Sequence, residues 1–137
     1  MPKACRSDWL KNVMASGAAA TKGIYTASGF FESAATAEGL DFVGRYTTRY
    51  GPEAPVLNSM GESCYEGVRL LAALIQRAGG LDVPGLCSVA DTVGYGGPRG
   101  EVHLQKCHLD QRIYLARADD LQFDVITSFR RAQQDER

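Results

Sequence analysis

Two long stretches of the chain carry apolar residues at the three- and four-residue spacing of an amphipathic helix. The first stretch predicts a helix from Ala37 to Tyr50, because Thr36 is a good N-cap and Glu38 places a carboxylate in the first turn, where the helix dipole favours it. Gly51-Pro52 is expected to end this helix. Its apolar positions are Leu40, Phe42, Val43, Tyr46 and Tyr50.

The second stretch predicts a longer helix, which begins at Ser59 and ends at Gly79-Gly80. Ser59 and Glu62 have the spacing of a capping box, in which each side chain accepts a hydrogen bond from the other residue's backbone amide. Cys64 lies on this apolar helix, so we expect it to be a small buried hydrophobe. The apolar stripe is broad enough to require a large partner surface, and it consists of Tyr65, Val68, Leu70, Leu71, Ala72, Leu74 and Ile75.

Shorter patterns predict the remaining elements. One short helix is expected from Ser7 to Ala15, and another from Val83 to about Val93 with Asp82 as its N-cap. Residues that favour a pleated surface predict a strand of parallel type from Lys22 to Ala27, before the breaker Ser28-Gly29. Alternating residue types then predict an antiparallel ribbon near the C-terminus, with strands at Glu101–Leu104, Ile113–Ala118 and Gln122–Ile126.

Composition fits a globular segment with one modest core, because the 137 residues are 45% hydrophobic and 23% charged. A formal charge of -1 gives no electrostatic basis for binding nucleic acid. No stretch approaches the roughly 18 apolar residues of a membrane span. The first residues lack the apolar region of a secretory signal, so the chain as written is expected in the cytoplasm.

Candidate catalytic and metal sites are weak. The cysteines Cys5, Cys64, Cys87 and Cys107 are irregularly spaced, without the Cys-x-x-Cys pair of a zinc ribbon or redox motif. Cys107 lies between His103 and His108, a combination that can form a nucleophile pair or metal cluster. We expect solvated histidines instead, because His103 shares a strand face with Glu101 and His108 falls in a loop.

Two further motifs do not indicate an enzyme. Glu62 and Glu66 lie one helical turn apart and would suit paired acid–base chemistry, but capping already accounts for Glu62. The segment Gly94–Gly100 is rich in glycine, yet it lacks a Lys-Ser/Thr ending and precedes a strand, so a phosphate loop is not expected. We therefore predict no enzymatic activity, no cofactor and no metal.

Segments at both ends of the chain resemble one known family. The C-terminal segments are Gly97–Leu104, His108, Arg112–Ala118 and Phe123–Val125, and the upstream ones are Gly23–Ser33, Thr36, Phe42-Val43, Tyr46 and Arg49–Gly51. In this order they resemble the closing part of type I periplasmic binding proteins, which are similar to the Leu/Ile/Val-binding protein. The likeness is strongest to the branch that senses or carries short amides and urea.

The resemblance implies an α/β fold made of two lobes, of which this chain is the C-terminal portion. Members of the family are well over twice as long, so residues 1–137 would form a partial domain that spans parts of both lobes and ends in an antiparallel ribbon. In the family, the apolar stripe of the helix that begins at Ser59 packs on the sheet of the N-terminal lobe. The resemblance also implies a structural role for His108 near the domain junction, although Cys107 stands where relatives carry a polar residue.

By the same resemblance, the function would be to bind a short amide, urea or a branched-chain amino acid, for an ABC transporter or an amide-responsive regulator. Its partners would be the missing N-terminal region and a transporter permease or regulatory protein. The expected ligand contacts are Tyr25, Phe30 and Phe31 as apolar walls, with Glu62 and Tyr65 as polar edges. Two alternatives stay open: a small interaction module that docks a partner or a second copy through Val68–Ile75, and a small hydrolase that uses Cys107 or Cys64.

Overall fold

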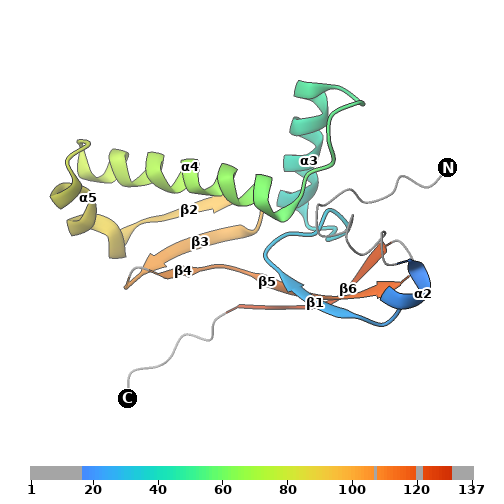
Figure 1. Ribbon diagram of the computed structural model, residues 1–137. Helices are drawn as coiled ribbons and strands as arrows, with labels where there is room; N and C mark the ends of the chain where they lie inside the picture. Colours follow the sequence, from blue (N-terminus) through green and yellow to red (C-terminus); the bar gives the residue numbers. More distant parts are fainter. Residues whose placement is uncertain (1–16, 107, 120–121, 131–137) are drawn as a thin grey trace, which may run out of the picture.

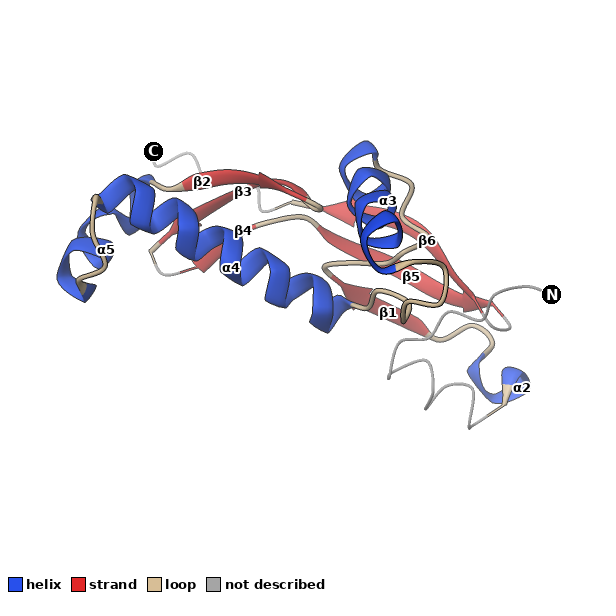
Figure 2. Cartoon of the chain, turned by 90° about the horizontal axis from the view of Figure 1, so that it is seen from above, coloured by secondary structure: helices blue, strands red, loops and turns tan. Residues whose placement is uncertain are grey.

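The computed structural model describes residues 17–106, 108–119 and 122–130, which form two three-stranded sheets and several helices (Figure 1). The helix α4 lies along the sheet β2-β3-β4, and α3 stands beside the N-terminal end of α4 (Figures 1 and 2). In chain order the elements are α2 (Ala18–Thr21), β1 (Tyr25–Ser28), α3 (Ala37–Tyr50), α4 (Ser59–Ala78), α5 (Val83–Val89), a 3-10 turn (Ala90–Thr92), β2 (Gly94–Gly97), β3 (Gly100–Gln105), β4 (His108–Asp110), β5 (Ile113–Asp119) and β6 (Gln122–Phe129).

The structure confirms the predicted bounds and caps of α3. The Thr36 hydroxyl accepts a hydrogen bond from the amide of Gly39 at 3.1 Å. Gly51 has a φ of 83°, a conformation that glycine adopts without steric cost, and its amide donates to the Thr47 carbonyl. On the apolar face, Phe42 is buried, whereas other positions of the same face remain exposed, including Leu40 and Tyr50.

The predicted capping box of α4 is wrong. Asn58 is the N-cap, since its side-chain oxygen accepts a hydrogen bond from the Gly61 amide at 2.8 Å. Asn caps a helix as well as Ser does, so the helix begins with Ser59 as its first residue and leaves the Glu62 carboxylate free for another partner. At the other end, Gly79 adopts the left-handed conformation and its amide donates to the Ile75 carbonyl, as the sequence predicts.

The face of α4 that is buried in this chain is the one that carries carboxylates. Glu62 and Glu66 are 0% and 3% exposed, because this side of the helix lies against β2 and the turn that follows it. The predicted apolar stripe lies largely on the opposite side, where Val68 is 69% exposed and Leu71 is 49% exposed. Cys64 is exposed on the same side, so its expected burial is also wrong.

Both sheets are antiparallel, with strand orders β1-β5-β6 and β2-β3-β4. This arrangement corrects the predicted parallel-type strand, because β1 pairs antiparallel with β5, and Tyr25 lies opposite Arg117. Parallel strands require a crossover connection, whereas here β1 forms hydrogen bonds with β5, which is one strand of the hairpin β5-β6. The C-terminal antiparallel ribbon is confirmed.

Two segments expected as loops are strands. Gly94–Gly97 forms β2, which pairs with β3, and His108 begins the short strand β4. The glycines of β2 let this strand approach its neighbours closely, because a Cβ on Gly94 would lie 2.5 Å from the His103 ring. The predicted helix 7–15, Cys5 and Cys107 lie outside the described residues.

The small core of the sheet β1-β5-β6 is formed by alternate residues of β5 together with β6. Ala116, Ala118 and Phe123 are buried, and Phe31 packs against them. A second buried point is Val102 in β3, which is fully inaccessible. None of the helices in the described part of the chain is long and apolar enough to cross a membrane.

Candidate functional site

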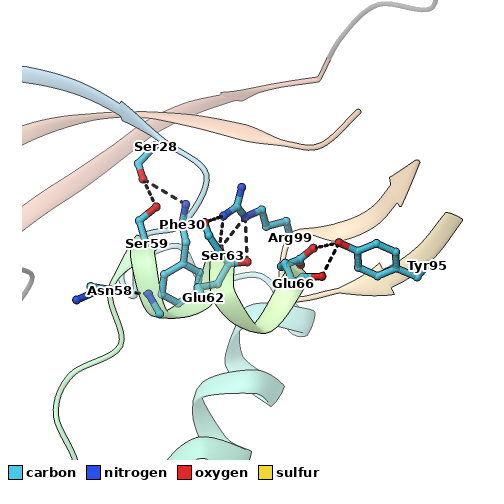
Figure 3. A network of polar contacts seen from close by, with 10 residues as sticks. Ser28, Phe30, Asn58, Ser59, Glu62, Ser63, Glu66, Tyr95 and Arg99 are labelled. Atoms are coloured by element: carbon cyan, nitrogen blue, oxygen red, sulfur yellow. Dashed lines mark hydrogen bonds and ion pairs between the residues drawn. The ribbon is translucent and has the colours of Figure 1, made fainter. Parts of the chain in front are cut away.

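A crossing segment, residues 28–31, follows β1 and passes along the start of α4 (Figure 3). The Ser28 hydroxyl donates a hydrogen bond to the Ser59 hydroxyl at 2.9 Å. Gly29 lies against the guanidinium of Arg99, where a Cβ would stand 2.1 Å from Nη1. Only glycine therefore allows the chain to pass so close to this cation.

Arg99 and Glu62 form a buried ion pair beneath the crossing segment (Figure 3). The Arg99 Nε lies 2.9 Å from both carboxylate oxygens of Glu62, and Nη2 donates to Glu62 Oε2 and to the Ser63 hydroxyl. Burial raises the pKa of Glu62 and the nearby Glu66 adds to this, while the guanidinium of Arg99 offsets part of the increase. The pair fastens the turn between β2 and β3 to α4.

Glu66 lies one turn further along α4 and faces Tyr95 of β2 (Figure 3). The Tyr95 hydroxyl donates to Glu66 Oε2 at 2.5 Å, and burial together with this carboxylate raises the pKa of Tyr95. The other oxygen, Oε1, is buried and has no hydrogen-bond partner among the described residues. A Cβ on Gly97 would lie 2.2 Å from it, so the β2 backbone closes over this carboxylate.

A row of aromatic rings continues the site from the crossing segment to the surface of α4. Phe30 packs edge-on against Phe42 at 6.2 Å between ring centroids, and Phe42 contacts Tyr65 at 4.7 Å. Tyr65 is partly exposed and borders a groove of about 430 Å³ between α3, α4 and the β2–β3 turn, which Arg69 and Pro98 also line. Arg69 donates to the Gly96 carbonyl at 2.8 Å and so ties α4 to β2.

The structure brings three of the five predicted ligand contacts together. Glu62 and Tyr65 lie in the first two turns of α4, and Phe30 lies next to them. The Glu62 carboxylate, however, is already paired with Arg99. Phe31 points the other way and packs on Phe123 at 5.5 Å between ring centroids, so the two adjacent phenylalanines enter different layers. Tyr25 is 60% exposed at the other end of β1.

Sequence reasoning missed Arg99 and Glu66 as buried partners. A signal for the carboxylates was present, because Glu62 and Glu66 share one face of a helix. Nothing local to Arg99 indicated that it would fold back 37 positions along the chain to reach Glu62.

The candidate metal and thiol residues lie apart from this network. Within residues 17–106, 108–119 and 122–130, no group of three or more His, Cys, Asp and Glu could hold a metal ion. Cys64 and Cys87 are exposed free cysteines. His103 lies 3.8 Å from Glu101 on the exposed face of β3, in agreement with the predicted strand alternation.

These observations define a class of protein. A strand leaves one sheet and leads into a glycine-bearing segment that is held on a second layer, and the chain also forms an antiparallel ribbon. This architecture matches part of the type I periplasmic-binding-protein fold. The chain belongs to the periplasmic binding protein family, whose family model matches residues 9–122. No curated protein matches the sequence.

Solved structures of the same fold include a periplasmic binding protein from Burkholderia mallei, with a TM-score of 0.71, 14% identity, and coverage of 88% of this chain and 34% of that one. The leucine-, isoleucine-, valine-, threonine- and alanine-binding protein of Brucella ovis gives a TM-score of 0.71 at 10% identity, covering 85% of this chain and 33% of that one. A solute-binding protein of an ABC transporter from R. palustris, in complex with benzoate, gives 0.63 at 22% identity, with 80% and 30% covered. The chain therefore spans about a third of the length of these proteins.

Proposed function

We propose that this chain is the C-terminal part of a solute-binding protein that takes a small polar ligand, namely a short amide, urea or a branched-chain amino acid. The observation that carries the proposal is the family match over residues 9–122. The protein would deliver its ligand to an ABC transporter permease in the periplasm, or report it to a regulatory partner in the cytoplasm. It would bind the ligand between its lobes and close around it, and it would catalyse no reaction.

The exposed side of α4 supports a role as one part of a larger site. Val68 and Leu71 are exposed on this side, and Met60 at its start is 76% exposed. Burying an apolar side chain of this size contributes about 1.5 to 3 kcal/mol, so an uncovered row of them favours a partner surface. Since the chain spans about a third of its structural relatives, we propose that the remaining lobe covers this face.

The five candidate contacts then divide into two groups. Tyr25 and Tyr65 keep exposed surface that a ligand can touch directly. Phe30 and Glu62 are buried in this chain, so they would support the residues of the cleft wall without touching the ligand. Phe31 would fix the crossing segment to the sheet. A ligand held between two lobes loses much of its contact surface when one wall is missing. The isolated chain should therefore bind weakly.

Calorimetry with acetamide, urea and leucine tests the proposal. The 137-residue chain alone should bind none of them more tightly than about millimolar. Fusion to the N-terminal region of a related binding protein should restore micromolar affinity for one of them. Micromolar binding by the isolated chain would show that its site is already complete, and no binding by a folded fusion would contradict the ligand class.

A pair of variants tests the proposed contact of α4 in the same fusion. Leu71→Asp should abolish the restored binding, because it places a charge on the face that the other lobe covers. Leu40→Asp makes the same change at a 57% exposed leucine of α3 and should leave binding intact. Equal loss in both variants would mean that the α4 face has no specific role.

A further inference from the structure

A second concave surface lies apart from the crossing segment, between α3, the loop to α4 and the start of α4. This groove, which we name the tyrosine groove, has a volume of about 600 Å³, within the range of small-molecule sites. Four aromatic rings and two guanidinium groups line it: Phe42, Tyr46, Tyr50, Tyr65, Arg45 and Arg49. The loop that follows α3 lies next to this helix (Figure 1), and residues of both elements line the groove.

The walls of the tyrosine groove are held in place by contacts within the chain. The Tyr46 hydroxyl donates to the Pro55 carbonyl at 2.9 Å, which fixes the loop against α3. Gly51 caps α3 at one end of the loop, and Asn58 caps α4 at the other. The rings of Tyr46 and Tyr50 lie 5.0 Å apart on one wall. A groove fixed in this way requires little ordering when a ligand enters, which favours binding.

The charge of the groove selects the kind of ligand. Two arginines line it and no carboxylate does. Arg45 is already paired with Asp41 at 2.9 Å, whereas Arg49 makes no hydrogen bond or ion pair within the described part of the chain. A guanidinium next to aromatic rings suits a planar carboxylate that carries an aromatic ring, because the carboxylate can meet the guanidinium while the ring stacks on tyrosine.

We propose that the tyrosine groove binds small aromatic carboxylates, with Arg49 as the anion contact and the rings of Tyr46 and Tyr50 as the stacking surface. A cationic ligand would meet Arg49, which no carboxylate of the groove compensates. A short aliphatic acid would leave the aromatic wall uncovered. The tyrosine groove shares Tyr65 with the candidate contacts of the proposed function, but Arg49, Tyr46 and Tyr50 belong to the groove alone. It does not require the missing lobe, so variants at these three residues test the two proposals independently.

Titration of the ¹⁵N-labelled chain with benzoate, followed by amide chemical shifts, provides the test. Benzoate should bind saturably with a dissociation constant of about 1 mM, which is reasonable for so small a ligand in an open groove. The shifts should concentrate at the amides around the groove, including Gly61 and Leu57. Benzyl alcohol keeps the ring and acetate keeps the charge, so each should bind more weakly than benzoate.

Two arginine variants distinguish binding in the tyrosine groove from general electrostatic attraction of benzoate to the protein. Arg49→Gln should weaken benzoate about three- to fivefold, the range for an exposed charge contact. Arg117→Gln removes the same charge from the exposed surface of β5 and should have no effect. Tyr50→Ala, at a 65% exposed ring, should also weaken binding while the chain stays folded. Equal affinity for benzoate and benzyl alcohol, equal behaviour of the two arginine variants, or shifts confined to another region would overturn the proposal.

Discussion

Removal of the Arg99 guanidinium should destabilise the chain more than any other single charge deletion in the described residues. Arg99→Met keeps an unbranched apolar stem but leaves Glu62, which is fully buried, without its cationic partner. Breaking a buried ion pair in this way costs about 3 to 5 kcal/mol, since one charge stays uncompensated in the interior. The loss is large relative to the total stability of a domain, typically about 5 to 15 kcal/mol.

The size of the effect should depend on pH. Burial raises the pKa of Glu62 above its ordinary value of 4.5, and loss of Arg99 raises it further. A protonated Glu62 carries no charge to compensate, so the cost of Arg99→Met should shrink towards pH 5 and be largest near pH 8. Urea denaturation followed by circular dichroism at both pH values measures this difference.

Two controls make the experiment decisive. Arg45→Met removes an arginine of the same kind from an exposed pair with Asp41, whose side chains are 59% and 65% accessible, and should cost less than about 1 kcal/mol. The double variant Glu62→Leu with Arg99→Met replaces both charges by apolar groups and should recover most of the loss. If Arg99→Met costs no more than Arg45→Met, the buried pair does not hold the turn on α4.

Three further changes test other parts of the structure. Leu71→Ala should change the free energy of unfolding of the isolated chain by less than about 0.5 kcal/mol, since Leu71 is half exposed, and a loss of 2 to 5 kcal/mol would show that the face is buried. Gly29→Ala should lower the denaturation midpoint because its Cβ would collide with Arg99, whereas Gly44→Ala, with open space around it, should not. In the unmodified chain, Glu62 favours folding below about pH 4.5, and this contribution is lost as the pH rises through its raised pKa, so Glu62→Gln should flatten the acid limb of a stability–pH curve.

The sequence by itself determined the features that depend on neighbours within about four residues. The bounds of α3, the Thr36 cap, the Gly79 stop and the Asp82 cap of α5 all follow from local hydrogen bonds and residue spacing. The strands β3, β5 and β6 follow from alternation. The order of the family's segments was also enough to identify the family over most of the chain.

The tertiary structure alone decided which surfaces meet. Periodicity marks an apolar side of α4 but cannot show that the carboxylate side is the buried one in this chain. The partners of Glu66 and Glu62 come from β2 and from the turn after it, 29 and 37 residues away. The direction of β1 and the separation of Phe30 from Phe31 depend in the same way on elements distant in the sequence. Contacts of this range are set by packing of the whole chain, and no short pattern encodes them.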